Sequence, residues 1–360
     1  MKKLLFLFFY VSFLFADDYS FDFEELEQID VKNYEYSAYI KGEYKYQDKN
    51  NAYINNYFSE TFLNFKYFHN DVIVESEFMI TYENIDSNED DGFITNQFFL
   101  NYKLDDNNKI NFGKKTSKWG KGYFFNPIAF IDIKKDPNNP EQSREGFTQI
   151  NYKYNKVYRG DLQNLSLDLV YFKTSKDLNN EFYDNNSNTI AMKTYLLYKN
   201  IDIDIAYIYN DILANKLGFD FSFNVETNFE LHGEYAIADN STYSNLFGIK
   251  YLTSNELTIT SEYFYQNEQL SSNQSFWDKE YLLTKFSQKE PFDIVYFSSY
   301  YKNIYNLSDN SQQNSIGFIY TKIKNLSIDL SFGVNSGNKK SEFGTKPVDK
   351  YSWLQLKYSF

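Results

Sequence analysis

Three side chains that could do acid–base or metal chemistry lie close together in the chain: Glu230, His232 and Glu234. In a β-strand, alternate side chains point to the same face, so this stretch would present a Glu–His–Glu stripe. An imidazole between two carboxylates can bind a metal or transfer a proton near neutral pH. The same stripe on a wall that faces water is an ordinary solvated patch, which is the interpretation we favour.

A second charged region is the stretch from Lys114 to Glu145, which is cationic within a chain whose formal charge is −13. Rings of lysine and arginine favour anions in a pore. Acidic residues elsewhere would oppose these cations, so the sequence leaves the sign of any selectivity open. The cations are Lys114, Lys115, Lys118, Lys121, Lys134, Lys135 and Arg144; the anions beside them are Asp132, Asp136, Glu141 and Glu145; the opposing acids are Asp202, Asp204, Asp220, Glu230 and Glu234.

Motifs for enzymatic chemistry are otherwise absent from the sequence. The chain has no cysteine, which excludes disulfides and thiolate metal sites. It has no Gly-x-Ser-x-Gly and no P-loop, and its other histidine, His69, falls in a predicted tight turn. We therefore expect neither an enzyme nor a cofactor, and an enzymatic alternative depends on His232 alone.

The elements that position these residues show a period of two. In "YEYSAYIKGEYKY", residues 34–46, tyrosine and small apolar residues alternate with charged ones. Such alternation predicts a strand with one apolar and one polar face. At about 3.3 Å per residue, a strand of this length spans roughly 40 Å, which is enough to cross a membrane at a tilt.

The same pattern recurs along the chain. We count about eighteen predicted strands, with sixteen as the alternative. They lie near 34–46, 57–68, 72–83, 94–104, 108–116, 145–154, 164–174, 189–199, 201–210, 216–225, 228–237, 244–253, 257–266, 279–287, 292–302, 314–323, 326–335 and 350–360. Tight turns alternate with long polar connections, which are predicted at 47–56, 84–93, 117–144, 175–188, 267–278, 303–313 and 336–349.

Aromatic residues make up 21% of the chain, and their positions decide between a soluble and a membrane sheet. A soluble sandwich has strands of about 5–6 residues, which is shorter than these. About eighteen strands enclose a lumen too wide to fill with side chains, so the apolar face must look outward into lipid. We therefore predict an all-β fold: a closed antiparallel up-and-down transmembrane barrel over 34–360.

The amino terminus resembles a secretory signal peptide. Two lysines precede an apolar run from Leu4 to Phe15, and the small residue Ala16 is followed by two aspartates. We predict a signal peptide at 1–16, with an uncleaved anchor as the alternative, and a periplasmic segment at 17–33.

The last strand ends without a tail. Leu354, Leu356, Tyr358 and Phe360 alternate with polar residues, and Phe360 is the final residue. This stretch resembles the terminal strand signal of Gram-negative outer-membrane β-barrel proteins. The resemblance implies that these four residues are read by the barrel assembly machinery and that the protein is porin-like.

The connection at 116–145 differs from the other loops because its middle is apolar, from Phe124 to Ile131. It is the third predicted outside loop, and in general porins that loop folds into the lumen. We predict that it packs against the inner wall and forms a constriction, with an external plug or partner patch as the alternative. The stretch "WGKGYFFNP…SREGF" also faintly resembles uncharacterised porin-like barrels and implies no substrate.

These patterns favour a channel for passive diffusion of small polar or charged solutes across the outer membrane of a Gram-negative bacterium. The expected partners are outer-membrane lipid and lipopolysaccharide, the barrel assembly machinery and small solutes. No nucleic acid is expected, and a homotrimer or a monomer stays open. The alternative is a non-channel barrel with a structural, adhesion or export role.

Overall fold

The computed structural model describes residues 32–49, 52–142, 145–180, 186–239, 241–267, 280–346 and 348–360. The chain divides into an amino-terminal unit, Met1–Asn33, and a second unit, Tyr34–Phe360. The predicted signal peptide, 1–16, and all but the last two residues of the predicted periplasmic segment, 17–33, lie outside the described residues. The second unit holds all of the strands that the structure describes.

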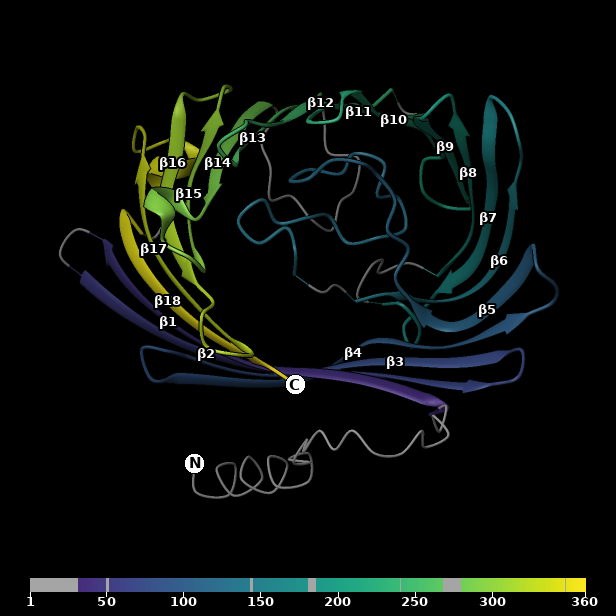
Figure 1. The fold of residues 1–360 in the computed structure, drawn as a ribbon, viewed down its shortest axis with the longest axis horizontal. Helices are drawn as coiled ribbons and strands as arrows, with labels where there is room; N and C mark the ends of the chain where they lie inside the picture. The colour runs from purple at the N-terminus through teal and green to yellow at the C-terminus, as the bar shows by residue number, and fades with distance from the viewer. Residues whose placement is uncertain are drawn as a thin grey trace, which may run out of the picture. The chain divides into compact units, whose positions relative to one another are not determined.

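Tyr34–Phe360 forms one closed sheet in which the structure describes eighteen antiparallel strands (Figure 1). Each strand pairs with its neighbours in sequence, and β1 closes the ring by pairing with β18. The predicted closed up-and-down barrel is therefore confirmed, and the alternative of sixteen strands is wrong. The strands are β1 (Tyr34–Lys49), β2 (Ala52–His69), β3 (Val72–Ile85), β4 (Asn88–Lys103), β5 (Asn108–Lys115), β6 (Phe147–Val157), β7 (Leu162–Thr174), β8 (Ser187–Tyr198), β9 (Ile201–Asn210), β10 (Lys216–Glu226), β11 (Phe229–Ala238), β12 (Tyr243–Leu252), β13 (Leu257–Gln266), β14 (Glu280–Lys289), β15 (Phe297–Asn306), β16 (Ser311–Tyr320), β17 (Leu326–Ser336) and β18 (Lys350–Ser359).

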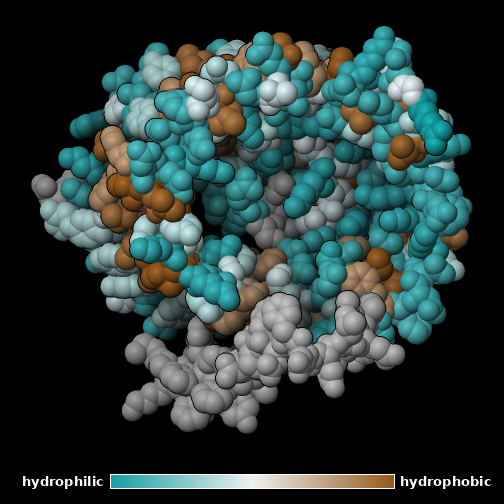
Figure 2. Space-filling model, in the orientation of Figure 1, coloured by the Kyte–Doolittle hydropathy of each residue, from teal (hydrophilic) through white to brown (hydrophobic). Residues whose placement is uncertain are grey.

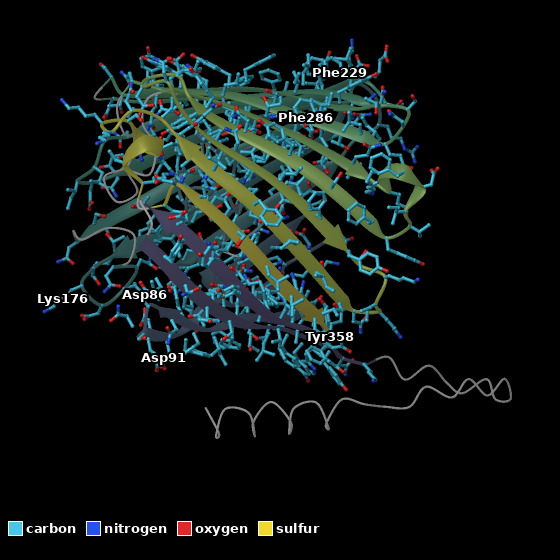
Figure 3. The ribbon with its side chains drawn as sticks, turned by 90° about the vertical axis from the view of Figure 1, so that its left-hand side faces the viewer. Asp86, Asp91, Lys176, Phe229, Phe286 and Tyr358 are labelled. Atoms are coloured by element: carbon cyan, nitrogen blue, oxygen red, sulfur yellow. The ribbon has the colours of Figure 1, made fainter. Side chains whose placement is uncertain are left out.

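Strand β9 shows the alternation between exposed outward side chains and buried inward side chains. Ile205, Tyr207 and Tyr209 point outward and are 40% or more exposed, whereas Asp204 and Ala206 point inward and are 1% exposed or less. Exposed aromatic and aliphatic side chains occupy outward positions on the other strands as well. The outer surface of the tilted strands is thus rich in apolar side chains (Figure 3), as a barrel in contact with lipid requires.

The connections differ between the two ends of the barrel. Tight turns such as Asn70–Asp71 and Lys199–Asn200 lie at one end, and the left-handed backbone at Asn70, Lys199 and Asn200 suits short hairpins. At the other end lie the strand termini that the longest connections join, and these connections are 116–146, 175–186, 267–279 and 337–349. The predicted alternation of short and long connections is therefore present.

Three predicted long loops, 47–56, 84–93 and 303–313, are wrong in extent because strands continue through most of their residues. The β3–β4 ladder, for example, runs to the pair Ile85 and Asn88 and leaves a two-residue turn. Polar side chains do not oppose a strand once it leaves the apolar band, since water then solvates both of its faces. Because polar residues were assigned to loops, the predicted strands ended too early.

Two short helical turns complete the described structure. Pro291–Asp293 forms a 3₁₀ turn (η1), so β15 begins at Phe297 and the predicted strand start at 292 is wrong. Glu342–Thr345 forms one helical turn (α2), whose first residue follows Ser341, and the Ser341 hydroxyl accepts a hydrogen bond from Gly344 N. Among the described residues, no helix is both long and apolar enough to cross a membrane.

Candidate functional site

The described residues of the connection between β5 and β6 lie inside the barrel (Figure 1), and we call the segment 116–145 the inner loop. Its central side chains are almost completely covered: Phe124, Phe125, Ile128, Phe130 and Ile131 are each 5% exposed or less. Burying so much apolar surface stabilises the folded-in position by the hydrophobic effect. The predicted packing of this loop against the inner wall is therefore present.

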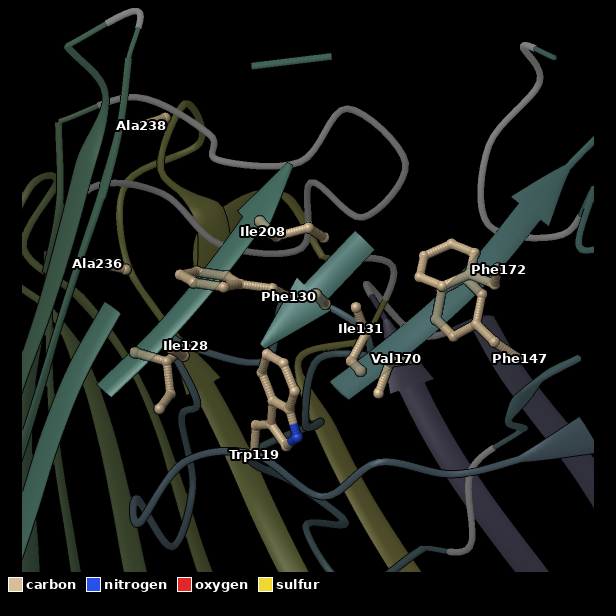
Figure 4. Close-up of a cluster of buried hydrophobic side chains, with 12 residues drawn as sticks. Trp119, Ile128, Phe130, Ile131, Phe147, Val170, Phe172, Ile208, Ala236 and Ala238 are labelled. Atoms are coloured by element: carbon tan, nitrogen blue, oxygen red, sulfur yellow. The ribbon is translucent and has the colours of Figure 1, made fainter. Parts of the chain in front are cut away.

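The wall beneath the inner loop is built from small residues. Ala206 and Ala236, on β9 and β11, are fully buried and pack in one cluster with Trp119, Ile128 and Phe130 (Figure 4). Gly218 on β10 completes this surface, because a Cβ there would lie 2.9 Å from Ile128 Cγ2 and 3.0 Å from Phe130 Cζ. Small side chains at these inward positions leave the volume that the loop occupies.

A second apolar cluster holds the earlier part of the inner loop. The ring of Phe125 stacks on Phe264 of β13, with centroids 4.7 Å apart and an interplanar angle of 12°. Tyr281 and Leu283 of β14 are fully buried in the same cluster. Stacked aromatic pairs add stabilisation beyond their buried area, so this contact fixes the loop as well as covering it.

Glu234 binds the backbone of the inner loop. Its Oε1 accepts hydrogen bonds of 2.7 Å from the N–H groups of Lys121 and Gly122, and its Oε2 accepts one of 3.1 Å from Ile128 N. Glu234 is 3% exposed. A loop buried away from water must find partners for its N–H groups, and a carboxylate is a strong acceptor for several of them at once.

Glu262 of β13 performs the same task for the next turn of the loop. It accepts hydrogen bonds from the N–H groups of Tyr123, Phe124 and Phe125, the last two at 3.0 and 3.2 Å. Its side chain is fully buried. Glu234 and Glu262 together therefore bind backbone N–H groups of six residues of the inner loop.

His232 lies between two carboxylates beneath Tyr123. Its Nε2 is 3.0 Å from Glu262 Oε1 and its Nδ1 is 3.5 Å from Glu230 Oε1. The Tyr123 hydroxyl donates to Glu230 at 2.9 Å and accepts from Lys250 Nζ at 3.2 Å. His232 is 0% exposed, so the interpretation of a solvated Glu–His–Glu patch is wrong for His232 and Glu234.

The first cations of the predicted charged region lie near the base of the inner loop. Lys114 forms an ion pair with Glu145, and Lys115 Nζ lies 3.8 Å from the ring centroid of Phe99. Lys118 is exposed. The three lysines therefore have three different surroundings.

Lys121 and Lys135 bind the wall and the loop itself, respectively. Lys121 Nζ lies 3.0 Å from Asp204 Oδ2; burial lowers the pKa of Lys121, but the nearby Asp204 and Asp220 raise it further, so the net shift is upward. Lys135 Nζ donates to the Gly122 carbonyl. Burial lowers the pKa of Lys134.

Two predicted pore residues of this region remain, Asp132 and Arg144. Asp132 is half-buried, and its Oδ1 accepts a 2.9 Å hydrogen bond from Ile133 N. Arg144 lies outside the described residues. The described charges of this region are thus spread along the inner loop and its base.

An acidic row crosses the wall under the inner loop. Asp204, Asp220 and Glu234 are aligned across β9, β10 and β11. Asp220 is 0% exposed, and neither of its carboxylate oxygens has a hydrogen-bond partner in the described part of the chain. Across the described residues, no group of three or more histidine, cysteine or acidic side chains could hold a metal ion.

The inner loop leaves a cavity of about 500 Å³ on the opposite side of the lumen. Its walls come from β1, β2 and β15–β18, together with Asp136, Asn138, Asn139 and Gln142 of the inner loop. Figure 2 looks into the barrel and shows this hollow beside the strands that Figure 1 labels β15–β18, with hydrophilic and some hydrophobic side chains around it. Most of the residues that line the cavity are polar or charged.

Lys302 connects this open side to the inner loop. The Lys302 ammonium donates to the Pro137 carbonyl at 3.1 Å, to the Asn138 carbonyl at 3.3 Å and to Asn138 Oδ1 at 3.2 Å. Lys302 is 8% exposed. The inner loop is thus tied to β15 as well as to the wall on which it packs.

Sequence reasoning missed several of these residues. Glu262 lies in "TITSEYFYQ" and is the one acidic residue on the inward side of this strand. A single inward carboxylate of this kind could have been recognised as a candidate site residue. Lys302 follows two tyrosines in β15 and gave no comparable signal. Their partners lie more than a hundred positions away in the chain, and cross-barrel proximity of this kind is not encoded in local spacing.

The carboxyl-terminal residues close the barrel. Leu354, Leu356, Tyr358 and Phe360 are outward-facing and between 37% and 45% exposed. The N–H of Phe360 donates to the Ala38 carbonyl at 2.9 Å. The alternation predicted for the last strand is present, and its role as an assembly signal stays a prediction.

No protein-family model matches this chain, and no curated protein matches its sequence significantly. Solved outer-membrane barrels do resemble it. Pseudomonas aeruginosa OccK5 (OpdH) has a TM-score of 0.61 at 11% identity and covers 91% of this chain and 98% of its own. Acinetobacter baumannii OccAB1 has a TM-score of 0.60 at 10% identity, with 94% and 99% covered.

A third similar structure is Wzi of Escherichia coli, described as an outer-membrane protein involved in group 1 capsule assembly and as a carbohydrate-binding β-barrel. Its TM-score is 0.60 at 12% identity, and 90% of this chain and 84% of Wzi are covered. Identities this low establish the fold alone. The resemblance to porin-like outer-membrane barrels is therefore confirmed as a shared fold.

Proposed function

We propose that this protein is an outer-membrane channel for passive diffusion of small polar or charged solutes. The observation that carries the proposal is a closed barrel with an apolar outer surface and a polar cavity of about 500 Å³ that the inner loop does not fill. An apolar outer surface needs lipid around it, and a polar lumen suits hydrated solutes.

The inner loop is the constriction in this proposal. It covers the inner wall from β6 to β14, and residues such as Asn138 and Gln142 border the remaining cavity. Solutes would pass between these loop residues and the strands β15–β18, β1 and β2. The pore residues we assign are therefore those of the open side, with Glu230, His232 and Glu234 as supports of the loop.

Export and assembly form part of the same proposal. The amino-terminal sequence at 1–16 would direct export, and Leu354, Leu356, Tyr358 and Phe360 would be read by the assembly machinery. Deleting Phe360 should then reduce the amount of folded barrel in the outer membrane. Normal assembly without Phe360 would contradict the assembly role.

The test is single-channel recording of the refolded protein in a planar bilayer under a salt gradient. Stepwise conductance is the expected result, and the sign of the reversal potential would give the ion preference. A correctly folded barrel without conductance would overturn the channel and favour a non-channel barrel.

A further inference from the structure

Two tyrosines on the open side of the lumen lie flat over glycines. Gly317 and Gly333 face inward on the neighbouring strands β16 and β17, where Gly317 pairs with Ser331 and Gly333 pairs with Ser315. Tyr300 on β15 is the other partner of Gly317, and Tyr351 on β18 is the other partner of Gly333. Each glycine therefore has a tyrosine on one side and a serine on the other.

The glycines allow close contact with the rings. A Cβ added at Gly317 would overlap the ring of Tyr300, and one at Gly333 would overlap the ring of Tyr351. Glycine inside a strand often marks such a close approach. The two rings extend over β16 and β17 from opposite sides, Tyr300 from β15 and Tyr351 from β18. Along the strands the two glycines beneath them are offset by two residues, or roughly 7 Å. Both rings line the cavity.

Two more aromatic side chains line the same cavity. Trp353 pairs with Ser331, its Nε1–H donates to Glu43 Oε2 at 3.1 Å, and Lys45 Nζ lies 5.5 Å from its ring centroid. Phe58 lines the cavity as well. The open wall thus presents apolar ring surfaces within an otherwise polar lining.

Neutral amides flank these rings. The carboxamide oxygens of Gln313 and Asn335, which are paired across β16 and β17, are buried without a hydrogen-bond partner among the described residues. Gln313 is 7% exposed and lines the cavity with Asn335. Both residues therefore place polar amide groups at the cavity wall beside the rings.

Most charges of the cavity already have partners. Lys41 Nζ lies 3.1 Å from Glu43 Oε1 and 3.0 Å from Glu60 Oε2, and Lys346 Nζ lies 3.5 Å from Glu342 Oε1. Glu83 accepts a 2.7 Å hydrogen bond from the Asn56 amide, and Lys302 binds the inner loop. Two further charged residues line the cavity: Lys45, which lies over the Trp353 ring, and Asp136, which accepts a 2.9 Å hydrogen bond from Asn138 N. The remaining groups of the lining are mainly ring faces, amides and hydroxyls.

We infer that this cavity binds neutral sugars, which makes sugars or short neutral oligosaccharides a substrate class of the channel proposed above. A pyranose ring has a face of C–H groups, which packs on an aromatic face, and a rim of hydroxyls, which bind amides. Tyr300 and Tyr351 offer two such faces in series. The amide side chains that line the cavity, Gln47, Asn56, Gln313 and Asn335, supply polar partners for the hydroxyls.

The experiment measures block of single-channel ion current by maltotriose, with potassium glutamate as a charged probe. Maltotriose should reduce the current in a saturable way that glutamate does not reproduce. Tyr300→Ala combined with Tyr351→Ala should weaken the apparent affinity for maltotriose by about tenfold, because two stacking surfaces are lost. The matched control is Tyr301→Ala, which removes a 41% exposed outward-facing ring from the same strand and should leave the affinity unchanged.

A second pair of variants tests the flat position of the rings. Gly317→Ala and Gly333→Ala keep both tyrosines but displace them, and each should weaken the block by maltotriose. Conductance without saturable block, or equal block in all variants, would overturn the sugar site and leave the channel standing. If the barrel does not conduct, calorimetric titration of the detergent-solubilised protein with maltotriose decides: tyrosine-dependent binding supports the site, and no binding overturns it.

Discussion

The inner wall of the barrel has two parts. Side chains alternate between the two faces of the sheet in both parts, but one part packs against the inner loop and the other lines the cavity. The covered wall, the inward faces of β6–β14, carries alanine, glycine and aromatic residues together with Glu234 and Glu262. The open wall, formed by β15–β18, β1 and β2, carries lysines, amides, hydroxyls and flat tyrosines. The difference shows that the alternation along a strand defines which residues face inward. The size and polarity of these inward residues define whether the inner loop packs on them or whether they line the cavity.

The strongest expected effect comes from removing the two carboxylates that bind the inner loop. Glu234→Ala with Glu262→Ala would leave backbone N–H groups of six loop residues without acceptors, at about 1–3 kcal/mol for each buried group. The loop should leave the wall, which limited proteolysis would detect as rapid cleavage within 116–145. Glu83→Ala on β3, a carboxylate that lines the cavity and binds Asn56 rather than the loop, is the control. A loop that stays protected in the double variant would refute the anchoring role.

Removing one apolar anchor should have the next largest effect. Ile128 is 0% exposed, and Ile128→Ala should destabilise the docked loop by about 2–5 kcal/mol through lost burial and a cavity. The measurement is the rate of proteolytic cleavage of the loop in the folded barrel. Ile323→Ala, at a 54% exposed position in a turn, should leave that rate unchanged.

Two glycines offer a finer comparison. A methyl group at Gly218 would press on Ile128 and Phe130, so Gly218→Ala should cost about 1–3 kcal/mol of loop docking. Gly42 has nothing within 4 Å of its added Cβ, so Gly42→Ala should be nearly neutral. Comparable cleavage rates in the two variants would mean that the loop does not fit the covered wall as described.

The smallest effect is expected at the connection between the two walls. Lys302→Met keeps the apolar stem but loses the hydrogen bonds to Pro137 and Asn138. The substitution also removes the cost of burying the Lys302 ammonium, so the two effects offset each other and the net change should be small. Open-channel current noise should rise because the bordering loop residues move more, while mean conductance changes little. Lys45→Met is the control. Unchanged current noise in Lys302→Met would contradict a role of the Lys302 hydrogen bonds in holding the inner loop.

The fold was predictable because eighteen strands repeat one pattern, in which one face must meet lipid. The inward position of Glu230, His232 and Glu234 followed from the same pattern. The burial of His232 and Glu234 did not, since it depends on which loop lies above them. The packing of the inner loop could be inferred from its apolar middle, Phe124 to Ile131.

The partners of that loop could not be inferred from the sequence. Glu262 binds N–H groups at 123–125 across the lumen, and Tyr300 lies over Gly317 because two strands meet there. Both contacts depend on register and closure, which become defined when the sheet forms. The polar loops were misjudged for the opposite reason, because strands such as β3 and β4 extend beyond the apolar band.

Substituted-cysteine accessibility tests the division of the lumen most directly, because the chain contains no cysteine. Single cysteines at Lys45 and Gln47, which line the cavity and are partly exposed, represent the open wall. Single cysteines at Ala206 and Ala236 represent the covered wall. A charged methanethiosulfonate reagent, added during recording in a planar bilayer, should react quickly at Lys45→Cys and Gln47→Cys and reduce the current. It should not react at Ala206→Cys or Ala236→Cys. Rapid modification at the two alanine positions, with protection at Lys45 and Gln47, would contradict the account.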